Sequence, residues 1–360
     1  CAVAAWRRAV VKPARYHDRL ATKGHGAEAY LILGLIALLM VADALYEGSA
    51  LAERGETTPA LPLASLASTL LGGLGEGTLQ AVHLGAFWVH NAALLFFLCY
   101  LPVSKHFHVL SALPNVYLSN VQPPGKIKPP RYDVEDLDAL DSLGVQKLED
   151  FTWKHILDFY SCTDCGRCSD NCPAYATGTP LSPRQISIKC RDEAYATWPV
   201  FGSTTPPDAR RSLLGDVIAD GEVWACTTCG ACEDACPVLI EYVDKIVDLR
   251  RRLVEEGDVP SGIQKALADV EKKGNPYGKM PRKRGDWVKD EDGAACGVRV
   301  LKNGEEAEDL FFTDSCSAYD PRIQQIARSF GRLLEAGGRD VGTLGKDEVD
   351  SGHEVRRIGE

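Results

Sequence analysis

The sequence predicts a mainly α-helical protein. We expect a hairpin of two membrane-spanning helices, then a helical cysteine-rich domain, then a partial α/β domain at the C-terminus. Three observations predict this fold class. Two apolar stretches with almost no charge lie in the first third of the chain, and one spaced run of cysteines occurs twice in the middle. Near the end, a strand-forming run, a helical run and a second strand-forming run follow one another.

Length and composition set the outer bounds. The chain has 360 residues, 13 cysteines and a formal net charge of −10, which suits two or three domains and argues against nucleic-acid binding. Residues 1–6 resemble the tail of an earlier span, so we expect a piece of a longer protein. The expected parts are a membrane part at 1–111, a proline-rich and acidic linker at 112–150, a cysteine domain at 151–256, a linker at 257–305 and a partial domain at 306–360.

The two apolar stretches predict two membrane spans. Residues 29–46 contain one charged residue, Asp43, and residues 79–103 contain none. Each is close to the roughly 20 residues that cross a bilayer. The alternative is a pair of buried helices in a soluble protein. It is disfavoured because uncharged runs as long as the second one are rare in soluble helices.

The distribution of lysine and arginine predicts the orientation. Basic residues precede the first span and follow the second, whereas the loop at 47–78 contains a single basic residue, Arg54. Under the positive-inside rule, both flanks lie on the cytoplasmic side. We therefore expect a multi-pass protein of the cell (inner) membrane, in contact with lipid, with the cysteine domain facing the cytoplasm.

The doubled cysteine run predicts two 4Fe–4S clusters. Each run has the spacing Cys-x-x-Cys-x-x-Cys-x-x-x-Cys-Pro, which is that of bacterial ferredoxins. In two-cluster ferredoxins the fourth cysteine of each run ligates the other cluster. We thus assign to cluster 1 the residues Cys162, Cys165, Cys168 and Cys236. To cluster 2 we assign Cys226, Cys229, Cys232 and Cys172.

Zinc sites and disulfides are the competing interpretation of these cysteines. A zinc site has no use for third and fourth cysteines at this spacing, each fourth one followed by proline, in two copies. Thiols kept for iron also indicate a reducing compartment, which agrees with the cytoplasmic side. We expect each following proline to open a helix. Further helices are expected at 151–160, 182–197, 207–219 and 237–256, and Cys190 is expected to be a core residue.

Histidines mark the second span and its end. His90 and His108 are 18 residues apart, which on a continuous helix is five turns, one shared face and about 27 Å. That separation suits two b-type haems, one near each membrane face. The alternative is that these histidines are packing or interfacial residues. We favour that alternative for His83 and His106.

The run from His90 to Pro114 resembles the last transmembrane helix of the nitrate reductase γ-subunit family of quinol-oxidising b cytochromes. In that family two histidines at this spacing ligate haem, with a Pro-x-Ser-basic step before the second. Pro102, Ser104 and Lys105 match that step. The resemblance implies that His90 and His108 bind haem b. The family's other two haem ligands come from an earlier helix that this sequence does not contain.

The C-terminal residues predict a βαβ unit with one cysteine in its first loop. Strands are expected at 309–313 and 340–344, with a helix at 322–336 between them. This segment resembles the start of the cysteine-rich domain of heterodisulfide reductase-like iron–sulfur oxidoreductases. The resemblance implies that Cys316 ligates a third iron–sulfur cluster. The family's second cysteine falls at Asp350, a hard oxygen donor that replaces thiolate poorly. The alternative is that Cys316 is an ordinary loop cysteine.

Nearly the whole chain resembles one group of membrane-bound enzymes, of the electron transfer flavoprotein:menaquinone oxidoreductase type. The sequence segments that carry this resemblance are GLIALLMVADALYEG, SKHFHVLSALPN, WKHILDFYSCTDCGRC and VWACTTCGACEDACPVLIEYVDKIVDLRRRLV. The resemblance implies an oxidoreductase that relays electrons between a cytoplasmic donor, which in this group is electron transfer flavoprotein, and menaquinone. Two other functions stay open: a thiol–disulfide oxidoreductase, and a non-catalytic electron wire in a larger respiratory complex. No acid–base catalytic residue is assigned.

Overall fold

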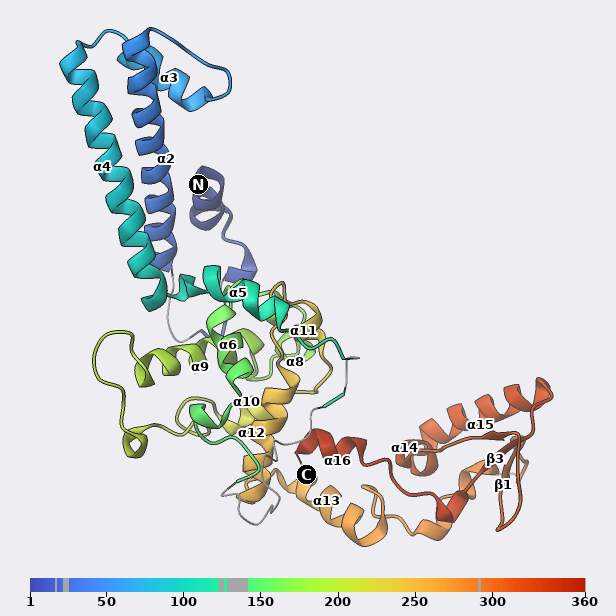
Figure 1. Ribbon diagram of the computed structural model, residues 1–360. Coiled ribbons are helices and arrows are strands. Elements are labelled where there is room, and N and C mark those ends of the chain that lie inside the picture. The colour runs from blue at the N-terminus through green and yellow to red at the C-terminus, as the bar shows by residue number, and fades with distance from the viewer. Residues whose placement is uncertain (17, 22–25, 123–125, 128–141, 291–292, 360) are drawn as a thin grey trace. The chain divides into compact units, whose positions relative to one another are not determined.

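The computed structural model describes residues 1–359, apart from residues 17, 22–25, 123–125, 128–141 and 291–292 (Figure 1). It divides into two compact units. The first unit comprises residues 1–128 and 145–246, and the second comprises residues 129–144 and 247–360. The acidic part of the expected linker, at 133–141, lies outside the described residues.

The first unit begins with the predicted helical hairpin. After the short helix α1 (Ala2–Trp6), helices α2 (Gly26–Arg54) and α4 (Glu76–Tyr100) lie side by side, as Figure 1 shows. Both are long and apolar enough to cross a membrane. Their outward faces expose large apolar side chains, among them Leu38, Leu84, Trp88 and Leu95. The hairpin of two long apolar helices is thus confirmed; α2 extends beyond its predicted span at both ends, whereas α4 begins before its predicted span and ends at Tyr100, short of residue 103.

Helix α3 (Pro62–Leu71) packs against α2 through small residues. A Cβ atom added at Gly48 of α2 would lie 2.5 Å from the Cβ of Ala67 and 2.9 Å from the carbonyl oxygen of Ala64. The Ser68 hydroxyl donates a hydrogen bond to the Glu56 carbonyl at 2.9 Å. Close approach of the two helices therefore depends on the missing side chain of Gly48.

The second long helix does not continue from His90 to His108, so the prediction of one shared face was wrong. Helix α4 ends at Tyr100, and two 3₁₀ turns follow before α5 (His108–Tyr117) begins. Pro102 lacks an N–H group and disfavours helix continuation. Ser104 is extended, and its side chain accepts a hydrogen bond from the backbone N–H of His106, which starts the next turn. The separation of about 27 Å, derived from continuous helical rise, does not apply.

The cysteine domain is helical, as predicted. Helices α6 (Trp153–Ser161) and α9 (Pro183–Thr197) match the expected ranges. The other helices are α7 (Arg167–Asp170), α8 (Pro173–Ala176), α10 (Asp220–Trp224), α11 (Ala231–Asp234) and α12 (Val243–Glu255).

Two expectations for the cysteine domain were wrong. No helix covers 207–219, where only the 3₁₀ turn Pro207–Ala209 and a bridge between Leu214 and Ile218 form. Pro173 opens α8, but Pro237 does not open a helix. Leu239 instead has a φ of +54°, which interrupts any helix before α12.

The second unit contains a three-stranded parallel sheet in the order β1-β3-β2. Its strands are β1 (Val298–Val300), β2 (Asp309–Leu310) and β3 (Val341–Thr343). Helix α15 (Pro321–Ala336) connects β2 to β3, which confirms the predicted strand–helix–strand order. The other helices are α13 (Ser261–Lys273), α14 (Ser315–Tyr319) and α16 (His353–Ile358).

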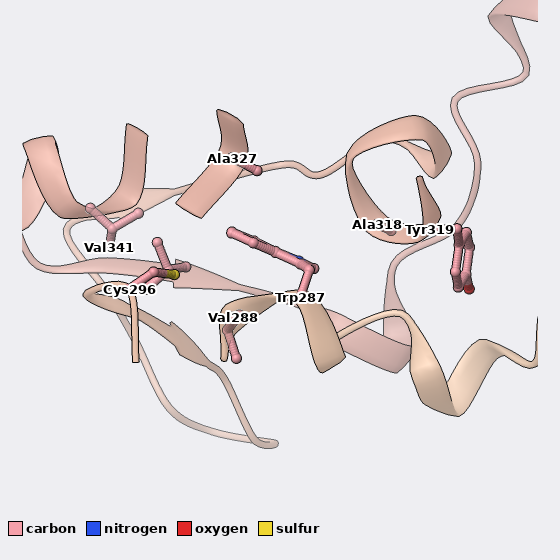
Figure 2. Close-up of a cluster of buried hydrophobic side chains, with 8 residues drawn as sticks. Trp287, Val288, Cys296, Ala318, Tyr319, Ala327 and Val341 are labelled. Atoms are coloured by element: carbon pink, nitrogen blue, oxygen red, sulfur yellow. The ribbon is translucent and has the colours of Figure 1, made fainter. Parts of the chain in front are cut away.

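The expected linker at 257–305 is not a linker. It forms α13 and β1, and it contributes Trp287, Val288, Cys296 and Val298 to the core of the second unit. Figure 2 shows Trp287 reaching toward Ala327 of α15, with Cys296 and Val341 nearby. The Trp287 ring also meets Phe311 edge-on at 5.4 Å. The segment is therefore part of the α/β domain.

Candidate metal centres

The two cysteine loops have the same backbone conformation. In the first loop, Asp164 and Gly166 flank the second cysteine with φ values of 55° and 82°. In the second loop, Thr228 and Gly230 occupy the equivalent positions with φ values of 52° and 76°. Left-handed residues turn successive N–H groups inward and form a concavity that suits anionic sulfur. The repeat in the sequence is therefore matched by a repeat of the left-handed backbone positions in the two loops.

Backbone N–H groups point at the cysteine sulfurs. The N–H of Thr228 donates to Cys226 Sγ at 3.3 Å, and the N–H of Ile240 donates to Cys236 Sγ at 3.4 Å. The hydroxyl of Tyr242, which is buried, donates to Cys168 Sγ at 3.5 Å. These donors stabilise negative charge on sulfur, the form in which cysteine ligates iron.

The structure brings together the four cysteines assigned to cluster 1. They line one cavity, with Asp164, Arg184 and Tyr242 in its wall. The members are Cys162, Cys165 and Cys168 from the first run and Cys236 from the second. Cys236 of the second run thus lies in the same cavity as three cysteines of the first run, as the predicted exchange requires.

The cysteines assigned to cluster 2 are also associated across the two runs. Burial raises the pKa of Cys232, and the nearby charges of Glu233, Cys226, Cys168 and Cys172 raise it further. Cys229 is exposed on the same loop. Cys172 of the first run thus lies within electrostatic range of the second.

Among the described residues, no three His, Cys, Asp or Glu side chains converge closely enough to hold a single metal ion. A cubane binds each thiolate at a different iron, so its ligands lie further apart than those of one ion. Burial raises the pKa of Cys162 to about 12 and that of Cys168 to about 11. These thiols need a bound cation to lose their protons at neutral pH, and iron would supply that charge.

Helix α5 is attached to the surroundings of cluster 1. Asn115 donates to the carbonyl oxygen of Val238 at 2.9 Å and accepts from Lys154 Nζ at 3.0 Å. Ser111 donates to the carbonyl of Tyr160, and Ala112 packs against the hydrophobic cluster that contains Cys162, Cys168 and Cys236. The helix that begins with His108 is thus in direct contact with the loop that follows Cys236.

A buried ion-pair network supports this contact. Asp158 of α6 is fully buried and forms ion pairs with Lys154, at 2.6 Å, and with Lys245. Burial alone would raise the pKa of Asp158, but the two lysines outweigh burial and lower it. Sequence analysis missed this network, because single charged residues in helices usually face solvent.

The histidines differ in the partners that they have. His108 Nδ1 lies 2.8 Å from the Lys105 carbonyl oxygen. Histidines that ligate metals usually bond one ring nitrogen to a carbonyl in this way, which leaves the other nitrogen, here Nε2, for the metal. His90 Nδ1 is buried and has no hydrogen-bond partner among the described residues. By contrast, His106 pairs with Glu28 at 3.3 Å and His83 stacks on Tyr46. The two predicted haem ligands thus lie on different helices, and neither has a side-chain partner among the described residues that competes for its ring nitrogens.

Cys316 and Asp350 line one pocket in the second unit, together with Tyr277, Ser315 and Glu354. Tyr277 donates to Cys316 Sγ at 3.3 Å, and Ser315 donates to the Asp350 carboxylate. The two positions paired by the sequence resemblance are thus neighbours. Tyr277 was missed because it precedes the β-strands by more than twenty residues and carries no motif.

Comparisons with known proteins relate the chain to iron–sulfur oxidoreductases. A family model described as a 4Fe–4S dicluster domain matches residues 161–240. The "Probable iron-sulfur-binding oxidoreductase FadF" of Bacillus subtilis is 36% identical, over 96% of this chain and 53% of the relative. The "EtfAB:quinone oxidoreductase" of Syntrophomonas wolfei is 28% identical, over 97% of this chain and 52% of the relative.

A third relative is the "Probable membrane-anchored ferredoxin" of Chromohalobacter salexigens. It is 36% identical, over 63% of this chain and 35% of the relative. No solved structure matches the chain. The chain spans about half the length of the first two relatives. The resemblance to this type of iron–sulfur oxidoreductase and the presence of a 4Fe–4S dicluster domain are confirmed.

Proposed function

We propose that this chain anchors an iron–sulfur oxidoreductase in the cell membrane and relays electrons between electron transfer flavoprotein and menaquinone. The observation that carries the proposal is the pair of matching cysteine loops, the first of which shares a cavity with Cys236 of the second, in a chain with an apolar helical hairpin. Two cubanes in one domain supply a path for single electrons. The name of the Syntrophomonas relative supports the two partners.

The proposed cluster ligands are those of the sequence prediction. Cluster 1 takes Cys162, Cys165, Cys168 and Cys236. Cluster 2 takes Cys226, Cys229, Cys232 and Cys172. The clusters supply the one-electron chemistry when bound, while the protein fixes their spacing and the hydrogen bonds to their sulfurs. Cys316 is proposed as a ligand of a third iron–sulfur cluster, beside Asp350.

His90 and His108 are the proposed axial ligands of haem b. Their nitrogens fit this role, because His108 Nδ1 is held by a backbone carbonyl and His90 Nδ1 is buried without a partner among the described residues. Haem would supply a one-electron carrier within the membrane. The break at Pro102 lets the two histidines take separate orientations, each set by its own helix.

The contacts of α5 support an order for the relay. His108 begins α5, and Ala112 and Asn115 of the same helix contact the surroundings of cluster 1. Cluster 1 is therefore the centre next to the haem end of the chain, and cluster 2 is the centre further along. Electrons would pass between His108 and cluster 2 by way of cluster 1.

The proposal is tested in membrane vesicles that contain the protein. Reduced electron transfer flavoprotein should bleach the cluster and haem absorbance, and a menaquinone analogue should restore it. Cys236→Ser should slow both the reduction and the reoxidation of the centres. Cys190→Ser, at a buried cysteine outside the two runs, should leave both rates unchanged. Failure of the flavoprotein to reduce the centres, with reoxidation by a disulfide substrate, would favour the thiol–disulfide function instead.

A further inference from the structure

Helix α5 has one polar, buried face and one apolar, exposed face. Leu113 is 78% exposed and Tyr117 is 88% exposed. Val109, Leu110 and Val116 on the same side of the helix are also exposed and apolar, as are Leu118 and Val121 just after it. Ser111 and Asn115, on the opposite side, are buried. An apolar face of this size is unusual for a segment that leads from one domain to the next.

The orientation of this face is fixed by the cysteine domain. Ser111 Oγ bonds to the Tyr160 carbonyl at 3.1 Å, and Asn115 Nδ2 bonds to the Val238 carbonyl at 2.9 Å. Both bonds lie on the polar side of α5, and Ala112 packs against the hydrophobic cluster around the first cysteine loop. Since these contacts hold α5 in place, the apolar residues cannot turn inward.

The apolar face is continuous with the predicted membrane span. The apolar stretch ends at Val103, and α5 starts only five residues later, at His108. In between, Lys105 and His106 both contact Glu28 near the start of α2, which places this turn at the ends of the two long helices. A short helix with one apolar face at that level has the character of an interfacial helix. Tyr117 suits the same region, because tyrosine is enriched where membrane meets water.

We propose that α5 lies in the cytoplasmic interface of the membrane, with Leu110, Leu113 and Tyr117 inserted among the lipid headgroups and upper acyl chains. The partner is the lipid surface itself. This inference rests on the proposed membrane anchoring by α2 and α4. Its consequence is that α5 holds cluster 1 directly beneath the membrane surface, because the other face of the same helix packs against the hydrophobic cluster that contains Cys162, Cys168 and Cys236.

The test measures what surrounds position 113 in lipid vesicles of phosphatidylcholine and phosphatidylglycerol. A nitroxide is attached through p-acetylphenylalanine in place of Leu113, which avoids the native cysteines. Matched labels replace Leu95, which is exposed on α4, and Asp208, which is exposed in the cysteine domain. Power saturation with the clusters oxidised then compares access of oxygen, which favours lipid, with access of a water-soluble nickel chelate.

We expect the oxygen-to-nickel access ratio at 113 to be several-fold higher than at 208 and lower than at 95. A ratio equal to that at 208 would show a solvated helix and overturn the inference. Protection from both reagents would show that protein covers the face, and it would also overturn the inference. If the label at 95 itself behaves as a water-exposed one, the proposed anchoring fails as well, which separates the two failures.

Discussion

At the scale of single residues, Tyr242 is the side chain closest to the chemistry of cluster 1. Its hydroxyl donates to Cys168 Sγ, and the side chain is buried. Such a hydrogen bond stabilises the more negative, reduced cluster. Tyr242→Phe should therefore lower the reduction potential. The expected shift is about 40 mV, if the bond is worth about 1 kcal/mol more in the reduced state.

The potential is measured by redox titration followed by electron paramagnetic resonance. Tyr195→Phe is the matched control, because its hydroxyl donates to the backbone carbonyl of Ser104 at 2.8 Å rather than to a cysteine. An unchanged potential in Tyr242→Phe, or an equal shift in Tyr195→Phe, would refute a specific effect of Tyr242 on the cluster.

Asp158 is the residue on which the packing of α5, α6 and α12 depends. Asp158→Asn leaves Lys154 and Lys245 buried without their carboxylate, and breaking a buried ion pair costs about 3–5 kcal/mol. Thermal unfolding followed by cluster absorbance should therefore occur at a clearly lower temperature. Asp170→Asn, at an exposed aspartate in α7, should have no effect. Equal melting temperatures for both variants would contradict the role of the network.

The same carboxylate makes a prediction about pH. The pKa of Asp158 is lowered in the folded protein, so its contribution to stability is present above the unfolded pKa of about 3.9. It is lost as the pH falls through the folded pKa. The difference in melting temperature between wild type and Asp158→Asn should accordingly be constant near neutrality and narrow below about pH 4. A difference that narrows at higher pH would assign the effect to another group.

At the scale of elements, the packing of α2 on α3 rests on Gly48. An added Cβ would meet Ala67 and the backbone of Ala64 well inside contact distance, so Gly48→Ala should destabilise the hairpin by about 1–3 kcal/mol. Gly34→Ala is the control, because nothing lies within 4 Å of the added Cβ in the same helix. It should be neutral or stabilising, by up to about 1 kcal/mol. Thermal melts in detergent compare the two, and equal melting temperatures would contradict the close approach.

Elements with a strong pattern were predictable from sequence, and interruptions of a pattern were not. The long uncharged runs predicted the hairpin, and the cysteine spacing predicted which four residues share the cluster 1 cavity. The break after Tyr100 was missed, because the apolar composition continues through Pro102 although the α-helix ends at Tyr100. Strand β1 was missed because it is only three residues long and pairs with a strand more than forty residues away.

At the scale of the whole molecule, sequence resemblance predicted distant pairings and partner molecules that the local sequence does not indicate. Nothing in the local sequence around Asp350 pairs it with Cys316, yet the resemblance did, and both line one pocket. The electron donor and acceptor likewise follow from relatives rather than from a fold feature. The buried charges around Asp158 escaped both approaches, since Lys154 lies on the same helix but Lys245 comes from α12, far along the chain.

The central claim is that two 4Fe–4S clusters exchange their fourth cysteines between the two runs. Anaerobically purified protein should hold about eight irons per chain, and reduction should produce two paramagnetic resonance signals. Cys236→Ser and Cys162→Ser should then weaken the same signal, and Cys172→Ser and Cys226→Ser the other. A single bound zinc, or loss of different signals in Cys236→Ser and Cys162→Ser, would contradict the account.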